Sequence, residues 1–297
     1  MSEENMPKCT LCPRECGADR EKERGFCGAD NRIRIARAAK HMWEEPVISG
    51  KNGSGTIFFS GCSLACEFCQ NFVLSHENQG IVITPARFYD IMFELKAQGA
   101  VNINLVTADH YIPYIVPVLR HARQDGLGIP VVFNTSSYLK LSALKQLKDA
   151  VDIYLADLKF SSPAAAMKYC SAPDYPQVAR AAIEQMVKKV GRPVIRGGIM
   201  QKGVIVRVLV MPGNLIDAKA SIKYLYDTYG DDIYISVMGQ YVPMPHVTHR
   251  ELKSALSPSA YRSVVRYAQS LGITNGFVQG SGADDKIYIP EFNCEGV

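Results

Sequence analysis

Short hydrophobic runs alternate with longer amphipathic stretches along most of the chain after residue 55. The runs that predict β-strands are residues 56–60, 101–106, 130–134, 152–157, 204–210 and 232–238. The amphipathic stretches predict helices at residues 84–98, 111–125, 140–149, 174–190, 217–229 and 258–271. Thr84-Pro85 and Ser257-Pro258 support two of these helix starts, because a capping residue followed by proline is typical of a helix N-terminus.

Six strand-helix repeats predict an α/β fold with parallel strands and right-handed crossovers. A closed barrel of this kind takes eight repeats, so we predict an open, partial (β/α)6 barrel. A doubly wound sheet is the alternative that the pattern leaves open. Residues 32–37 alternate basic and apolar side chains, which predicts an additional edge strand. We assign residues 1–50 to an N-terminal cysteine-rich metal module and residues 51–297 to the barrel with a C-terminal extension.

Three cysteines follow the first predicted barrel strand in one short loop. Cys62, Cys66 and Cys69 have the spacing C-x3-C-x2-C. Thiolates spaced in this way can hold one face of a 4Fe-4S cluster, which ordinarily takes four cysteine ligands. No fourth cysteine follows nearby, so one iron would stay open to an external ligand, as in a catalytic metal site. A zinc loop or three buried thiols is the alternative.

The cysteine pattern, together with Phe68, resembles the motif C-x3-C-x-aromatic-C of the radical S-adenosylmethionine (SAM) superfamily. The resemblance implies that SAM chelates the open iron and that an electron from the cluster cleaves it to a 5′-deoxyadenosyl radical. It also implies that Phe68 packs near the adenine. Across nearly the whole chain, the motifs resemble the branch that is like pyruvate formate-lyase activating enzyme.

That branch implies a substrate and partners. The expected reaction is hydrogen abstraction that activates a glycyl radical enzyme, with electrons from a reductant protein such as flavodoxin or ferredoxin. Modification of a small molecule or a peptide is the alternative within the superfamily. A non-catalytic iron-sulfur electron carrier is the alternative of a different class.

Candidate SAM-binding residues lie at the predicted strand ends, because ligands of parallel α/β folds bind at the carboxyl ends of strands. The resemblance implies that Asp157 and Lys159 contact SAM as an Asp-x-Lys motif. Arg207 lies inside an apolar strand and needs a partner, since a buried unpaired charge is costly; we predict the SAM carboxylate. Polar residues at other strand ends complete the candidate set: Thr107, Asp109, Asn134, Ser136 and Gln240. We expect His110 to be a structural histidine.

A second cysteine set precedes the barrel, with the spacing C-x2-C-x3-C-x10-C. Its members are Cys9, Cys12, Cys16 and Cys27. Four thiolates can close a tetrahedral zinc site or hold a second iron-sulfur cluster, so we predict a separate, mainly structural metal. An oxidised pair is the alternative. The two remaining cysteines, Cys170 and Cys294, are expected to act as small buried hydrophobic residues.

Composition narrows the partners and the compartment. The formal net charge of +4 over 297 residues is too small, and the basic residues too scattered, to predict nucleic-acid binding. No run approaches the roughly 18 apolar residues of a membrane helix, so we expect no membrane partner. The acidic start leads into no apolar segment, and nine cysteines without a signal peptide predict a reducing compartment, the cytoplasm.

Overall fold

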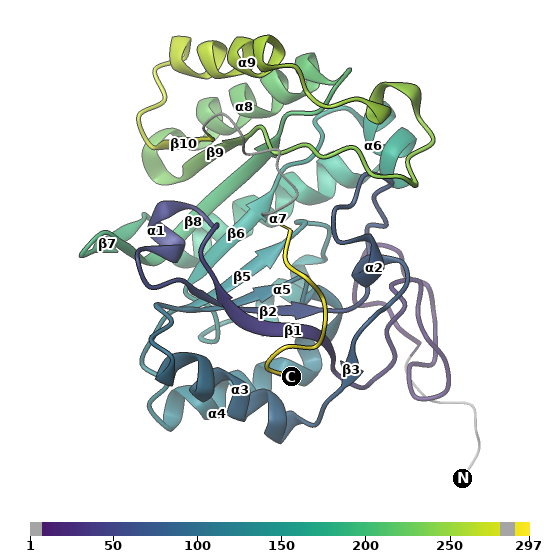
Figure 1. Ribbon diagram of the computed structural model, residues 1–297, viewed down its shortest axis with the longest axis vertical. Helices are drawn as coiled ribbons and strands as arrows, with labels where there is room; N and C mark the ends of the chain where they lie inside the picture. The colour runs from purple at the N-terminus through teal and green to yellow at the C-terminus, as the bar shows by residue number, and fades with distance from the viewer. Residues whose placement is uncertain (1–7, 280–288) are drawn as a thin grey trace.

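The computed structural model describes residues 8–279 and 289–297. A curved sheet forms its centre, and six of its strands run parallel to one another (Figure 1). These strands are β2 (Ser54–Phe59), β4 (Ile103–Val106), β5 (Val131–Thr135), β6 (Ile153–Asp157), β8 (Ile199–Leu209) and β9 (Tyr234–Met238). They coincide with the six predicted strands and are neighbours in chain order. The predicted open (β/α)6 arrangement is therefore confirmed.

Both edges of this sheet are extended by short strands. The additions at the edges are β1 (Arg34–His41), antiparallel to β2; β3 (Ile81–Val82), antiparallel to β1; and β10 (Gly276–Val278), parallel to β9. Off this path, β7 (Val194–Arg196) pairs antiparallel with the start of β8. β1 contains most of the predicted additional strand. The hydrophobic pattern does not predict β3, β7 or β10, because two or three residues show no readable alternation.

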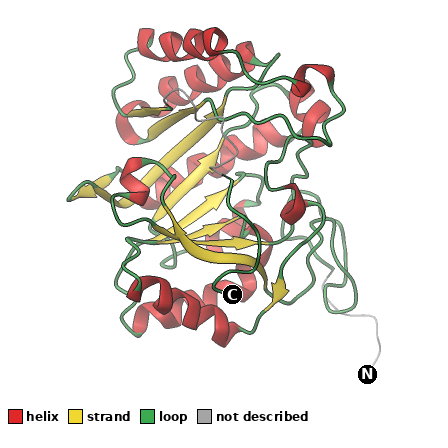
Figure 2. Ribbon diagram, viewed as in Figure 1, coloured by secondary structure: helices red, strands yellow, loops and turns green. Residues whose placement is uncertain are grey.

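Helices cover the outer face of the curved sheet (Figure 2). The six predicted helices form as α3 (Pro85–Ala97), α4 (Ile112–Gln124), α5 (Leu141–Gln146), α7 (Tyr175–Val190), α8 (Leu215–Tyr229) and α9 (Pro258–Ser270). Thr84 and Ser257 cap α3 and α9 as expected, since each side chain accepts a backbone N–H of the first turn. Shorter helices that the pattern does not predict are α1 (Pro46–Ser49), α2 (Phe72–Ser75) and α6 (Pro163–Cys170), with 3-10 turns at Asp109–Tyr111, Gly230–Asp232 and Arg250–Lys253. None of the helices in the described part of the chain is long and apolar enough to span a membrane.

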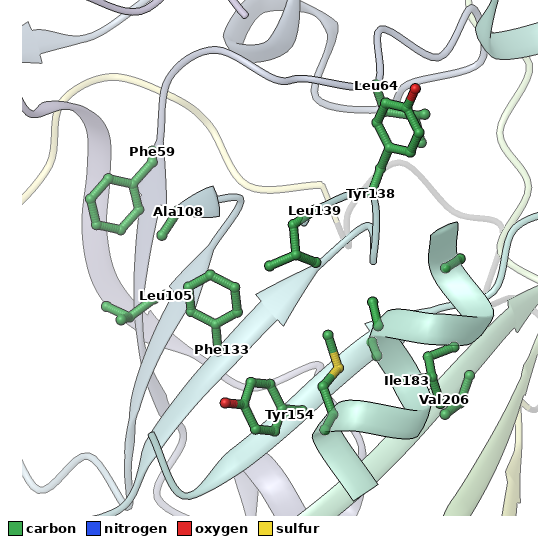
Figure 3. Close-up of a cluster of buried hydrophobic side chains, with 14 of the residues drawn as sticks. Phe59, Leu64, Leu105, Ala108, Phe133, Tyr138, Leu139, Tyr154, Ile183 and Val206 are labelled. Atoms are coloured by element: carbon green, nitrogen blue, oxygen red, sulfur yellow. The ribbon is translucent and has the colours of Figure 1, made fainter. Parts of the chain in front are cut away.

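Alternation along each strand divides the side chains between two faces. On the outer face, large residues of successive strands pack together and against the helices; Figure 3 shows Phe59, Leu105, Phe133 and Tyr154 in this layer. On the inner face, hydrophobic residues near the amino-terminal strand ends pack around Ile48 of α1. Polar residues follow on that face toward the carboxyl ends. The period of two therefore places the predicted polar residues inside the barrel.

The two ends of the described chain lie beside this sheet. Residues 8–33 contain no helix or strand and run next to the loop that follows β2. Residues 289–297 run along β1, where the Ala38 N–H donates to the Glu295 carbonyl at 2.8 Å and the Cys294 N–H donates to the Ala36 carbonyl at 2.9 Å. β1 falls inside the predicted 1–50 module yet pairs with the main sheet, and the boundary at residue 50 stays a prediction.

Candidate active site

A cavity of about 350 Å³ lies on the inner face of the sheet, toward the carboxyl ends of the parallel strands. It brings together eleven residues that the sequence proposes for cofactor or cluster binding: Cys62, Cys66, Phe68, Cys69, Thr107, Asn134, Ser136, Asp157, Lys159, Arg207 and Gln240. Strand register contributes to this grouping, because Asp157 pairs with Arg207, which pairs with Ser236 of β9. Asp109 and the four N-terminal cysteines do not line the cavity.

The cluster loop, residues 60–71, leaves the end of β2 in a tight turn. Gly61 has a φ of +89°, and a Cβ there would lie 2.4 Å from the Cys27 carbonyl oxygen. The next residue, Cys62, donates its N–H to that same carbonyl at 3.0 Å. Only glycine tolerates both the backbone angle and the close approach. The turn therefore seats the cluster loop directly against the N-terminal segment.

Glu67 and Gln70 fix the far half of the cluster loop to the barrel. The Glu67 N–H donates to the Tyr169 carbonyl at 2.9 Å, and its carboxylate accepts from Thr248 Oγ1 at 2.8 Å and from the His249 N–H at 3.1 Å. Burial by itself would raise the pKa of Glu67, but the hydrogen bonds from Thr248 and His249 outweigh it and lower the pKa to about 2. Gln70 Nε2 donates to the Gln240 carbonyl at 2.6 Å. The loop is thus held by segments from three other parts of the chain.

The three thiols of the cluster loop suit a multinuclear cluster. Burial raises the pKa of Cys62 to about 12, and the charges of Cys66 and Cys69 add to the rise. Burial likewise raises the pKa of Cys69. Three thiolates cannot coexist so closely without positive charge between them, which iron-sulfur clusters supply. Across residues 8–279 and 289–297, no three Cys, His, Asp or Glu side chains are spaced to share one metal ion, whereas a cubane takes each cysteine on a different iron.

A fourth thiol lies beside this set. Cys170, the last residue of α6, is buried, as the sequence predicts, and its Sγ lies 3.2 Å from that of Cys66. Its hydrogen bond, followed by burial, raises the pKa of Cys66 well above the ordinary value. Cys294 is only partly buried, against β1 in the C-terminal residues.

Asp157 and Lys159 form an ion pair at the end of β6. Lys159 Nζ lies 2.6 Å from Asp157 Oδ2, and the pair lines the cavity. Burial lowers the pKa of Lys159, but the Asp157 charge outweighs it, so the pKa lies well above the ordinary value. Tyr175 fixes the turn between them, since its hydroxyl accepts the Lys159 N–H at 2.9 Å and lies 3.1 Å from the Asp157 carbonyl. The cavity therefore contains a fixed ammonium group at this corner.

Arg207 has two carboxylate partners within the chain. Its Nε donates to Glu45 Oε1 at 2.8 Å and its Nη2 to Glu45 Oε2 at 2.6 Å, while Nη2 also pairs with Glu44. Asn104 Nδ2 donates to Glu44 at 2.8 Å. Both carboxylates come from the connection between β1 and β2, which crosses the inner face. The expected need for a partner is met here, and contact between Arg207 and a SAM carboxylate stays a prediction.

Thr107 and Asp109 follow β4 and take different directions. Thr107 lines the cavity with a φ of +58°, which is unusual for a β-branched residue. Asp109 is buried behind the cavity wall and accepts the hydroxyl hydrogen of Thr135. Burial raises the pKa of Asp109 to about 6, and its second oxygen has no partner among the described residues. The 3-10 turn that starts at Asp109 explains its direction, which strand-end reasoning does not reveal.

His110 connects the cluster loop to the N-terminal segment. Its Nε2 donates to the Ser60 carbonyl at 2.8 Å, and its own carbonyl accepts from Arg20 at 2.6 Å. Burial lowers the pKa of His110 to about 3, with the Arg20 charge acting in the same direction. The ring is therefore neutral and fits the structural role expected for it.

The four N-terminal cysteines lie close to one another outside the cavity. Burial raises the pKa of Cys12 to about 11, a backbone hydrogen bond from Arg14 opposes it, and the charges of Cys27, Cys9 and Cys16 add to it. A Cβ on Gly25 would lie 3.2 Å from the Cys16 sulfur and 3.6 Å from the Cys27 sulfur. Metal binding by this set, and the choice between zinc and a second cluster, stay predictions.

Several cavity residues escape sequence reasoning. They come from the β1–β2 connection and from the end of the chain: His41, Trp43, Glu44, Glu45, Phe277, Val278, Gln279, Ile289 and Pro290. Neither segment belongs to a strand-helix repeat, so no strand-end rule points to it. The sequence does contain two adjacent acidic residues, Glu44 and Glu45, beside an apolar run. They could have been proposed as partners of the buried Arg207.

No protein-family model matches the chain. An uncharacterized protein of Methanocaldococcus jannaschii is 30% identical over 244 residues, which cover 79% of this chain and 66% of that protein. The chain thus spans just under two thirds of this relative.

Solved structures share the fold at low sequence identity. SuiB of Streptococcus suis, bound to S-adenosylmethionine, has a TM-score of 0.52 and 15% identity over 77% of this chain and 50% of its own. SuiB bound to the precursor peptide SuiA has a TM-score of 0.51 and 14% identity over 75% of this chain and 47% of its own. The hydrogenase maturase HydG of Carboxydothermus hydrogenoformans has a TM-score of 0.50 and 15% identity over 79% of this chain and 56% of its own.

Proposed function

The chain has the fold of radical SAM proteins, and from that premise we propose that it is a radical SAM enzyme. The observation that carries the proposal is the grouping of Cys62, Cys66 and Cys69 with the Asp157–Lys159 pair around one cavity at the carboxyl ends of parallel strands. A 4Fe-4S cluster held by these three cysteines would supply an open iron for SAM and the electron for reductive cleavage of its sulfonium bond.

The protein's own residues bind and orient SAM in this proposal. Lys159 keeps its charge beside Asp157 and can donate a charge-assisted hydrogen bond to the SAM carboxylate. Asn134 and Ser136, at the end of β5, offer amide and hydroxyl groups to the ribose. Phe68 is buried in an edge contact with Phe160, at a ring-centroid distance of 5.9 Å, and offers the adenine an apolar wall.

The ion-pair group of Arg207, Glu44 and Glu45 affects which end of SAM can bind beside it. Arg207 is neutralised by Glu44 and Glu45, so the group has an excess of one negative charge where it lines the cavity. Negative charge favours the SAM ammonium and sulfonium over its carboxylate. We therefore assign Arg207 to holding the two carboxylates in place, with Lys159 as the candidate for the SAM carboxylate.

The finer proposal is hydrogen abstraction from a glycyl residue of a partner protein, with reduction by a flavodoxin or ferredoxin. A peptide or a small molecule is the alternative, and one observation favours it. Ile289 and Pro290 line the cavity beside β1, and Phe277 and Val278 of β10 line it at the opposite edge of the sheet. Both sides of the six-strand sheet are thus extended. A substrate would enter over the strand ends, which suits a narrow peptide segment better than a folded surface.

The test is anaerobic incubation of the reconstituted protein with a chemical reductant and SAM. We expect 5′-deoxyadenosine and methionine in equal amounts. Protein with a full cluster that yields neither product would refute the radical SAM assignment. Addition of a candidate glycyl radical enzyme should produce a protein-centred doublet in electron paramagnetic resonance (EPR). Deoxyadenosine without that doublet, across all candidate partners of the organism, would favour the peptide or small-molecule reaction.

A further inference from the structure

Arg14 reaches from the N-terminal cysteine set to the cluster loop. It stands two residues from Cys12 on one side and two residues from Cys16 on the other. Its Nε donates to the Ser63 carbonyl and its Nη2 to the Leu64 carbonyl, each at 3.0 Å. Both acceptors lie between the first two cysteines of the cluster loop. A single side chain therefore bridges the two cysteine sets.

The same guanidinium also holds the end of α6. Its Nη2 donates to the Cys170 carbonyl at 2.9 Å and its Nη1 to the Ser171 carbonyl at 2.5 Å. The rings of Phe26 and Tyr138 lie over it, with centroids at 4.4 and 5.3 Å. Arginine offers five N–H donors in a planar fork, and four carbonyl contacts use most of them. Lysine cannot reproduce this geometry.

The α6 end matters because it contacts the middle of the cluster loop. The Cys170 sulfur lies 3.2 Å from that of Cys66, and the Tyr169 carbonyl accepts the Glu67 N–H. Arg14 thus holds the backbone just before Cys66 directly, through Ser63 and Leu64. It also holds the end of α6, where Cys170 contacts Cys66. Loss of a residue that orients metal ligands ordinarily lowers the metal affinity of the site.

We propose that Cys9, Cys12, Cys16 and Cys27 hold a structural iron-sulfur cluster whose occupancy orders the cluster loop, with Arg14 as the positioning residue that couples them. A multinuclear cluster fits their spacing better than one zinc ion, because no three of these side chains in the described residues are placed to share a single ion. The inference rests on the proposed function, because it takes a cluster on the loop cysteines as given. A cluster held by Cys12 and Cys16 would fix the backbone on both sides of Arg14. The Arg14 guanidinium would then be held in position for its carbonyl contacts. The Cys27 carbonyl, bonded to the Cys62 N–H, adds a second link from the same set.

The experiment compares Arg14→Gln with Arg32→Gln in the full chain. Arg32 is the matched control, because it belongs to the same segment and its exposed side chain pairs, among the described residues, with nearby Asp30. Each protein is reconstituted anaerobically with iron, sulfide and zinc, and iron and zinc are then counted. The rate at which a chelator removes iron, and the change in the EPR spectrum of the reduced cluster on SAM addition, are measured as well.

We expect Arg14→Gln to keep the metal of the N-terminal set and to lose the loop cluster to the chelator about 10- to 100-fold faster than the wild type. Arg32→Gln should match the wild type. Arg14→Lys should fall close to Arg14→Gln, since it keeps the charge and lacks the fork. Cys12→Ser should weaken the loop cluster as Arg14→Gln does, and the double variant should be no worse than either single one.

Two results would overturn the coupling. Equal chelation rates and an unchanged SAM response in Arg14→Gln would show that Arg14 positions nothing. Loss of both metals in Arg14→Gln, with an unfolded circular dichroism spectrum in Arg14→Lys as well, would make Arg14 a requirement of the fold instead. Failure of the proposed function is distinguishable, because the wild type itself would then take up no loop cluster.

Discussion

The two cysteine sets differ in the part of the fold that carries them, and this decides whether their thiols reach the cavity. Cys62, Cys66 and Cys69 follow a parallel strand and line the cavity where the other strands also end. The N-terminal four lie in a segment without helix or strand and line no part of that cavity. The first set can share a bound molecule with side chains of several strands. The second can act on that molecule only through the chain between them.

Access to the cavity separates the two sets more clearly than burial does. Each set has one buried thiol, Cys66 or Cys27, and two partly buried ones, and Cys16 of the N-terminal set is exposed. An open iron is useful only where substrate can reach it and bulk water is limited, so the cavity is the place for chemistry. A closed four-thiolate site needs no such access. The difference in cavity access supports the proposal that the loop set serves catalysis and the N-terminal set serves support.

The largest expected effect comes from removing one cysteine of the loop set. Cys66→Ala should abolish the visible absorption of the loop cluster and all SAM cleavage, because a cubane with two protein ligands and an open iron is not retained. Cys12→Ser should instead lower the metal content of the N-terminal set and the unfolding temperature, and leave residual SAM cleavage. Cys294→Ala, outside both sets, is the control.

Equal loss of SAM cleavage in Cys66→Ala and Cys12→Ser would break the comparison, since both sets would then be needed for the chemical step. A full loop cluster retained by Cys66→Ala would refute the ligand assignment.

The next largest effect concerns the buried charges of the cavity, which the loop set lines and the N-terminal set does not. Arg207→Ala leaves Glu44 and Glu45 without their cation inside the barrel, and losing one partner of a buried pair costs about 3–5 kcal/mol. We expect the free energy of unfolding to fall by that amount in a denaturant titration. Glu44→Gln with Glu45→Gln in the same chain should recover part of it. Full stability of Arg207→Ala alone would mean that the pairing is absent in solution.

A smaller effect tests SAM binding without disturbing the cluster. Lys159→Ala should weaken SAM affinity by about 1.5–3 kcal/mol, the range for a hydrogen bond to a charged group, while iron content stays constant. Titration calorimetry under anaerobic conditions measures it. Lys140→Ala, whose ammonium pairs with exposed Glu15, is the control. Unchanged affinity in the Lys159 variant would remove this residue from the SAM site.

The sequence predicts the architecture well because the repeats are long and regular. Each of the six parallel strands is an apolar run, and each is followed by a helix whose period is readable. It misses β3, β7 and β10, whose few residues pair only because longer strands are already in place. It also misses α6, an eight-residue helix directly before α7, because the pattern of one helix runs into that of the next.

The site is predicted where a sequence motif or a strand end marks it. The cysteine motif predicts the cluster loop, and the resemblance implies Asp157 and Lys159 through the Asp-x-Lys motif at the end of a predicted strand. The sequence shows that Arg207 needs a partner but not that Glu44, 163 residues earlier, supplies it. Asp109 follows a strand as well, yet its side chain turns away from the cavity, because local turn geometry overrides the strand-end rule there. Long-range pairs of this kind depend on the tertiary fold.

The smallest effect examines the contact between the two sets through pH. His110 has a pKa of about 3 in the fold and roughly 6.5 in the unfolded chain. Between these values the unfolded chain binds more protons, so the stability contribution is complete above about pH 6.5 and declines as the pH falls toward 3. At pH 5 the deficit is about 2 kcal/mol, from 1.4 kcal/mol per pH unit. Protonation would place a positive charge on a buried ring near the Arg20 guanidinium, which donates to the His110 carbonyl.

Replacing the ring should therefore flatten this acid dependence. His110→Gln keeps a donor for the Ser60 carbonyl and has no proton to gain, so its unfolding free energy should fall less than that of the wild type between pH 7 and 5. Asp109→Asn provides a control of opposite sign. Its carboxyl has a raised pKa of about 6, so ionisation weakens the fold as the pH rises from roughly 4 to 6, and the amide should remove that loss. Parallel pH curves for the wild type and His110→Gln would show that burial does not lower the pKa of the ring.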